Sequence, residues 1–131
     1  MESVEYDFPA DKVTGVATAE ALIGGRFCVC VDAVSTAGLR MVSYPATKGQ
    51  SHFLVKNDVA QDANMTLVRK GVWTMTAGDT ITAPGAVMSD DVGRPIPASG
   101  AGYILGYALS DATVGVAVVI QLALPGYLQA A

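Results

Sequence analysis

Two cysteines and the single histidine are the residues whose types could support nucleophilic chemistry. Cys28 and Cys30 are separated by one residue, and His52 follows Ser51 further along the chain. A reactive thiol needs a setting that stabilises the thiolate, whereas this cysteine pair lies within an apolar run. Neighbouring residues of a strand point to opposite faces, so Ser51 is not placed to work with His52. The pattern favours two reduced thiols packed in a strand, and no catalytic residue is predicted.

Metal and cofactor chemistry finds equally little support. The two cysteines and one histidine supply fewer ligands than a structural zinc site needs. The acidic pairs Asp58 with Asp62 and Asp90 with Asp91 lack the alternating ligands and terminal glutamate of a calcium loop. The chain also contains no P-loop, nucleophile elbow, zinc-protease motif or dinucleotide-binding glycine motif. We therefore predict no metal, no cofactor and no enzymatic activity.

The elements that would position any site are short apolar segments separated by glycine, proline and aspartate turns. Short apolar segments that alternate with turn-forming residues are typical of β-strands. Strands are predicted at residues 26–34, 39–44, 52–55, 65–68, 72–76, 79–82, 86–88, 94–96, 103–109 and 116–124. The fold class predicted is all-β: a small β-sandwich or β-barrel of short antiparallel strands, forming a single domain over residues 23–131.

A weak internal repeat runs through these strands, with a spacing of roughly 50 residues. Residues 38–46 resemble residues 93–98, and residues 53–55 resemble residues 103–105. In each copy a connection that contains aspartate follows, and then another strand. The repeat predicts two similar β-hairpin units packed together.

Residues 1–22 differ from the rest of the chain. They are acidic at the start and show neither the alternation of a strand nor the periodicity of a helix. We interpret this stretch as an extended N-terminal arm, ending with a helical turn at residues 18–22. Aromatic side chains supply much contact area at low entropic cost. The candidate residues for binding a partner are therefore Glu5, Tyr6, Phe8 and Pro9.

The composition indicates what kind of partner is expected. Hydrophobic residues make up 51% of the 131 residues and charged ones 15%, below the roughly 25% typical of soluble proteins. Part of the apolar excess is expected to meet other protein chains, so we predict a homo-oligomer. A net charge of −4 argues against nucleic-acid binding. No apolar run is long enough for a membrane helix. The acidic start of the chain differs from the basic start of a secretion signal, so we expect synthesis and retention in the cytoplasm.

Several segments together resemble the small head-decoration, or capsid cement, proteins of tailed bacteriophages. They are Ala21 to Phe27, Thr76-Ala77-Gly78-Asp79, Val87 to Asp91, Gly93-Arg94, Ile104 to Leu109, and Gly115 with residues 116–122. The resemblance covers most of residues 21–124. It implies a structural virion protein, made in the host cytoplasm, that binds the outer surface of the capsid and bridges neighbouring subunits of the major capsid protein. It also implies that the homo-oligomer is a trimer.

Two alternatives remain open from the sequence. One is a surface fibre module that binds glycans or a receptor through Trp73, Tyr103 or Tyr107. The other is a small enzyme built around the two cysteines and His52.

Overall fold

The structure is a computed structural model that describes residues 12–17, 21–34, 40–61 and 63–130. Within these residues the chain is all-β, as predicted, and no helix that could span a membrane is found. The strands are β1 (Lys12–Ala17), β2 (Arg26–Val34), β3 (Arg40–Ser43), β4 (Phe53–Val55), β5 (Asn64–Val68), β6 (Val72–Thr76), β7 (Gly85–Ser89), β8 (Pro95–Pro97), β9 (Gly102–Ala108) and β10 (Ala117–Gln129).

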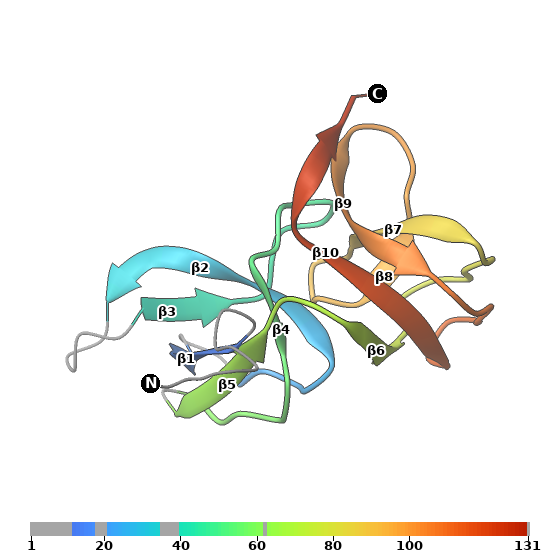
Figure 1. Cartoon of the computed structure of the whole chain (residues 1–131). Helices are drawn as coiled ribbons and strands as arrows, with labels where there is room; N and C mark the ends of the chain where they lie inside the picture. Colours follow the sequence, from blue (N-terminus) through green and yellow to red (C-terminus); the bar gives the residue numbers. More distant parts are fainter. Residues whose placement is uncertain (1–11, 18–20, 35–39, 62, 131) are drawn as a thin grey trace, which may run out of the picture.

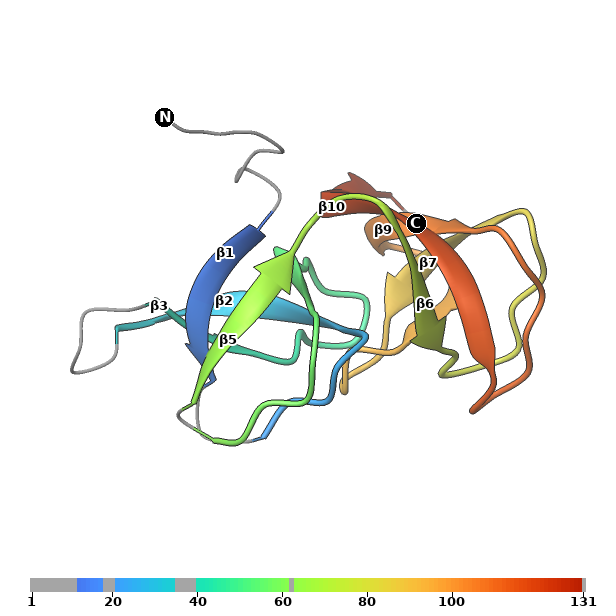
Figure 2. The ribbon, with the colours of Figure 1, turned by 60° about the horizontal axis from the view of Figure 1, so that its bottom comes forward.

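The ten strands form two units that lie side by side (Figure 1). The first half of the chain forms a closed barrel in the order β1-β3-β2-β4-β5. The second half forms a five-stranded sheet in the order β6-β10-β9-β7-β8. Figure 2 shows the short connection from β5 to β6 that joins the two units.

The two units share one pairing scheme, which supports the repeat seen in the sequence. In the barrel, β2 pairs with β3 and β4, β4 pairs with β5, and β5 pairs with β1. In the sheet, β7 pairs with β8 and β9, β9 pairs with β10, and β10 pairs with β6. Each strand of the first half therefore has a counterpart in the second half, five strands later.

The units differ in closure, because β3 pairs in parallel with β1 whereas no such pairing joins β8 to β6. Prolines explain part of the difference. Pro95 and Pro97 lie opposite Ser89 and Val87 in the antiparallel ladder, so their nitrogens face the outer edge of β8, where the Pro95 carbonyl accepts one hydrogen bond from the Gly78 amide over 2.8 Å. A proline nitrogen cannot donate a hydrogen bond, and this edge is a poor template for a further strand. The second sheet remains open and keeps one face available to solvent or to a partner.

One hydrophobic core links the barrel to the sheet. The barrel residues Phe27, Leu54 and Val68 are buried in the same cluster as sheet residues such as Leu105 and Ile120. A second, smaller cluster fills the barrel itself, with members Leu22, Cys28, Val42, Val55, Val59 and Leu67. The shared cluster holds the open sheet in a defined position against the barrel.

Backbone hydrogen bonds strengthen this junction. The Phe27 amide donates to the Gly93 carbonyl over 2.8 Å, which ties β2 to the hairpin between β7 and β8. The Lys48 amide donates to the Ser89 carbonyl over 2.7 Å, and the Lys48 carbonyl accepts from the Tyr103 amide over 3.0 Å. These bonds connect the loop after β3 with both β7 and β9.

Five sequence-based expectations differ from the structure. Residues 12–17 were assigned to the arm of residues 1–22 but form β1, whose pairing is supplied by β3 and β5. Leu22 makes a β-bridge with Val59 rather than ending a helical turn, and residues 18–20 lie outside the described residues. Residues 79–82 form no strand, only a bridge from Ile81 to Ala112. The last strand continues five residues beyond 124, and the β1–β3 pair is parallel.

Candidate functional site

The buried cysteine cannot act as a nucleophile. Cys28 lies in the barrel cluster with no exposed surface. Burial is the main cause that raises the pKa of its thiol far above the ordinary value of 9.0, and the nearby Cys30 adds to the rise. Because the thiolate is the reactive form, the thiol of Cys28 is a packing group.

Hydrogen bonds of Cys30 and His52 join β2 to the segment just before β4. The Cys30 amide donates to Nδ1 of His52 over 3.0 Å, and the His52 amide donates to the Cys28 carbonyl over 3.0 Å. Ser51 is buried, and its hydroxyl donates to the Cys28 carbonyl over 2.8 Å rather than to an imidazole. Among the residues that the structure describes, these bonds link the imidazole to a backbone amide and the hydroxyl to a backbone carbonyl, and neither forms a nucleophile–base pair. Among the described residues no group of histidine, cysteine or acidic side chains could hold a metal ion.

Thiol reactivity checks this assignment. At neutral pH we expect a water-soluble thiol reagent to label partly exposed Cys30 quickly, and Cys28 only on unfolding. Since global opening costs 5–15 kcal/mol in typical domains, the two rates should differ by at least ~1,000-fold. The Cys30→Ser variant should lose the fast phase, and the Cys28→Ser variant should keep it. Rapid labelling of Cys28 in the folded protein would contradict the assignment.

The acidic turn residues stabilise backbone rather than binding ions. Asp90 accepts hydrogen bonds from the amides of Val92 and Arg94, and its second oxygen accepts one from Arg94 Nε over 2.8 Å. Asp58 accepts from the Gly24 amide over 2.8 Å. These carboxylates hold the β7–β8 hairpin and the start of β2 in place.

The outward face of the open sheet is an uncharged surface that the strand register defines. Directly opposed residues point to the same side of a sheet. Val72 lies opposite Gln121, which lies opposite Tyr107, and Thr74 lies opposite Val119. We call this surface the open face; its members are Val72, Thr74, Thr76, Tyr107, Leu109, Ala117, Val119 and Gln121.

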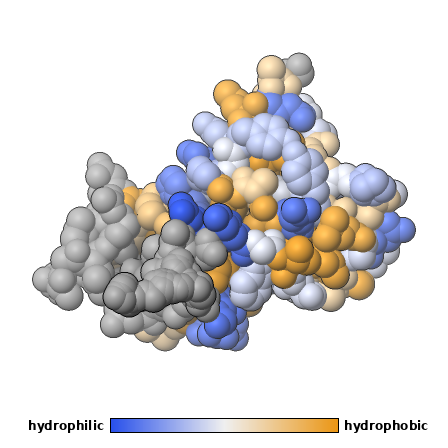
Figure 3. All heavy atoms as spheres, in the orientation of Figure 1, coloured by the Kyte–Doolittle hydropathy of each residue, from blue (hydrophilic) through white to orange (hydrophobic). Residues whose placement is uncertain are grey.

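None of these side chains is charged, and two large apolar ones are well exposed, Val72 by 56% and Leu109 by 51%. Figure 3 shows hydrophobic atoms gathered over the first half of β10 and its surroundings. Tyr127 borders the open face, and its hydroxyl is hydrogen-bonded to that of Tyr107. This bond is the main cause that raises the pKa of Tyr127 above its ordinary value of 10.0.

The sequence-predicted partner residues are only partly placed. Glu5, Tyr6, Phe8 and Pro9 lie outside the described residues. Of the aromatic residues considered for glycan binding, Trp73 and Tyr103 pack against the shared core, and Tyr107 is exposed on the open face.

Sequence reasoning did not single out Val72, Leu109 or Tyr127. The sequence alternation along β6 groups Val72 with Thr74, and the alternation along residues 103–109 groups Tyr107 with Leu109, which is the available signal. It does not say which side of the strand faces outward.

No family model matches the chain, and no curated protein matches it. Among solved structures it is similar to the head fiber gp8.5 N base of bacteriophage phi29, with a TM-score of 0.73 and 16% sequence identity. The match covers 90% of this chain and 97% of that one. The likeness extends over both units and shows that the two chains share a fold.

Proposed function

We propose that this protein is a structural component of a bacteriophage head, attached to the outer surface of the capsid as a homo-oligomer. In this role it bridges neighbouring subunits of the major capsid protein and stabilises the shell. The open face is the observation that carries the proposal, because it is a sheet surface without charge in an acidic chain. The shared fold with a phage head-fiber base supports the same class of protein.

The occupant that we assign to the open face is a second copy of this chain. Exposed apolar residues on a sheet gain free energy when buried, by about 25 cal/mol for each Å² of apolar surface. A partner bearing the same uncharged patch leaves no charge unpaired at the contact, which avoids the desolvation cost of buried ions. The low charge content of the chain, 15%, fits such association. We favour a trimer, as the resemblance to decoration proteins implies.

The capsid contact is assigned to the residues before β1. Glu5, Tyr6, Phe8 and Pro9 combine acidic and aromatic character and precede the first barrel strand. A shell repeats its binding sites many times, so weak contacts made by each copy of an oligomer add through multivalency. A single strong contact is not required.

Deletion of residues 2–11 tests the attachment. Lys12 pairs with Val68, so the deletion stops before β1 and leaves the barrel ladder intact. The full chain is expected to pellet with purified expanded heads, and the deleted chain should be retained at least ~10-fold less. Unchanged oligomeric mass of the deleted chain is the control for folding. Equal retention of both chains would show that residues 2–11 do not make the capsid contact. Failure of the full chain to pellet with heads would show that the capsid is not its partner.

A fibre module that binds glycans is the second candidate. The observation in its favour is the exposed tyrosine pair of Tyr107 and Tyr127, since sugar rings pack on exposed aromatic faces. Reproducible binding of the purified chain to a glycan array, together with loss of that binding in the Tyr107→Ser variant, would favour glycan binding over the capsid role.

A further inference from the structure

A pocket opens on the outward side of the sheet unit, between the β6–β7 and β9–β10 connections. It has a volume of about 360 Å³. Figure 1 places both connections on the side of the sheet unit away from the barrel. The volume lies at the lower end of the range for ligand sites and suits one long side chain. Among the described residues, the lining consists of Thr80, Ile81, Thr82, Asp111, Ala112 and Thr113.

A short β-bridge gives the pocket its shape. The Ile81 amide donates to the Ala112 carbonyl over 2.8 Å, and the Ala112 amide donates to the Ile81 carbonyl over 3.0 Å. Both side chains are buried in the shared core, so the residues on either side of them point outward. The Ala83 amide donates to one carboxylate oxygen of Asp111 over 2.7 Å. The bridge therefore holds three threonine hydroxyls beside one oriented carboxylate.

The barrel contains the same bridge without the hydroxyl groups. Leu22 and Val59 form this bridge. In both units the amide two residues after the first bridge partner donates to the aspartate just before the second, over 2.8 and 2.7 Å. The fold does not require hydroxyl groups around the bridge, because the positions that correspond to the three threonines are apolar in the barrel. They are Ala21, Ile23 and Ala60.

The lining suits the ammonium group of a lysine. The two connections, residues 77–84 and 109–116, contain acidic residues and no basic one. One oxygen of Asp111 already accepts from the Ala83 amide, which favours a compact ammonium over the two-pronged guanidinium of arginine. Threonine oxygens accept further hydrogen bonds from an ammonium, and threonine methyl groups contact its aliphatic stem. A sugar is less suited, because the described lining contains no aromatic ring.

The surroundings of the pocket indicate that the lysine belongs to a protein. Leu109, Val114 and Val116 are exposed large apolar residues in the same connection as Asp111. Exposed apolar residues that gather around a polar pocket are typical of protein–protein contacts. Leu109 is also a member of the open face, the surface assigned above to contact between copies. A second copy of this chain is therefore the occupant that the surroundings favour.

The distribution of basic residues determines which part of a second copy can supply the lysine. All four lysines lie within residues 12–70, and the one basic residue after them is Arg94. Arg94 is paired with Asp90 of its own chain over 2.8 Å. The lysine therefore comes from the first half of the chain, and the contact joins two different surfaces. Such contacts form closed rings when the rotation between copies allows it, and a trimer is one such ring.

We propose that the pocket binds a lysine side chain of a second copy of this chain. The ammonium group pairs with the second carboxylate oxygen of Asp111, and the threonine hydroxyls accept its other hydrogen bonds. The inference rests on the homo-oligomer of the proposed function, to which it adds one polar contact beside the uncharged open face. A charged pair at the edge of an interface mainly determines the orientation of the partners.

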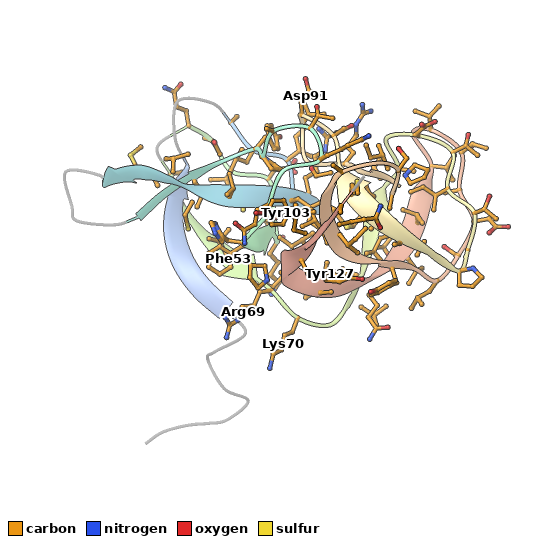
Figure 4. The ribbon with its side chains drawn as sticks, turned by 90° about the horizontal axis from the view of Figure 1, so that it is seen from above. Phe53, Arg69, Lys70, Asp91, Tyr103 and Tyr127 are labelled. Carbon is orange, nitrogen blue, oxygen red and sulfur yellow. The ribbon has the colours of Figure 1, made fainter. Side chains whose placement is uncertain are left out.

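Zero-length cross-linking of the full chain identifies the partner of Asp111. A carbodiimide couples a carboxylate to an amine only where the two groups touch. Oligomers mixed from unlabelled and isotope-labelled copies distinguish a link between copies from a link within one. We expect Asp111 to be joined to a lysine of the other isotopic form. Asp91 is the control carboxylate and should give no such link, because Figure 4 shows its side chain pointing away from the protein.

Sedimentation velocity of the Asp111→Asn variant provides a second readout without any cross-linker. The asparagine oxygen can still accept from the Ala83 amide, so the bridge is retained while the charge is lost. Association is expected to weaken about fivefold for each contact, the upper range for an exposed charge pair. Asp91→Asn removes the same charge from the β7–β8 hairpin and should associate like the native chain.

Three results would overturn the proposal: a native oligomer without a link from Asp111 to a second copy, links from Asp91 in equal yield, or unchanged association of Asp111→Asn. A native chain that sediments as a monomer would overturn the homo-oligomer of the proposed function together with this inference. The mass of the native chain without cross-linker therefore distinguishes the two failures.

Discussion

Replacing Leu109 with aspartate is expected to give a folded monomer that no longer binds heads. Leu109 is half exposed beside β10 and lies outside the buried clusters, so the isolated fold should tolerate the change. At an interface between copies, the new carboxylate would be buried without a partner. Such burial costs about 3 kcal/mol or more, which corresponds to at least ~100-fold weaker association.

Sedimentation velocity across a range of concentrations measures this effect. Ile23→Asp is the matched control, because Ile23 is 46% exposed and lies in the barrel unit, away from the open face. The control is expected to keep the oligomeric mass of the native chain. An unchanged mass for Leu109→Asp, or an equal loss in both variants, would show that the open face is not the interface.

Replacing Gly93 with alanine is expected to have the largest effect on folding. Gly93 has a φ of +78°, which disfavours any residue with a Cβ by roughly 1–2 kcal/mol. The added Cβ would also press against the Phe27 carbonyl oxygen and lie 3.1 Å from the Phe27 nitrogen. Both Phe27 atoms are backbone, so relief requires β2 to move away from the hairpin. We expect a loss of about 3–5 kcal/mol, a large share of the stability of a typical domain.

Gly115 provides the control for backbone conformation alone. Its φ is +82°, but a Cβ built there would meet nothing within 4 Å. Gly115→Ala should therefore lose only about 1–2 kcal/mol. Chemical denaturation of the two variants gives the comparison. A Gly93→Ala protein as stable as Gly115→Ala would show that the contact between β2 and the β7–β8 hairpin does not hold the two units together.

Turn-forming residues next to a strand explain which strands could be predicted from the sequence. The bounds of β2 and β6 match the expected ranges 26–34 and 72–76, because glycines precede both segments. β1 could not be predicted, because its short sequence has no alternation and its pairing comes from β3 and β5 far along the chain. A proline usually ends an interior strand, yet Pro125 lies in the register shift between Leu122 and Tyr127, where the ladder needs no donor.

The open face shows what strand patterns leave undecided. In β9 and the residue after it, the sequence places Tyr103, Leu105, Tyr107 and Leu109 on one side, but the first two are covered and the last two are exposed. The barrel residue Phe27 shares a cluster with Leu105, so tertiary contacts cover only one end of that side. Composition predicted an apolar excess without its location. The closure of one unit and the openness of the other determine where that excess lies.

The composition of purified phage particles tests the central claim most directly. Quantitative mass spectrometry of intact virions should find this chain in a fixed ratio to the major capsid protein. Brief protease treatment of intact virions should remove the chain without releasing DNA, as expected for a protein on the outer surface. Absence of the chain from purified virions, or its protection from protease until the heads are opened, would contradict the account.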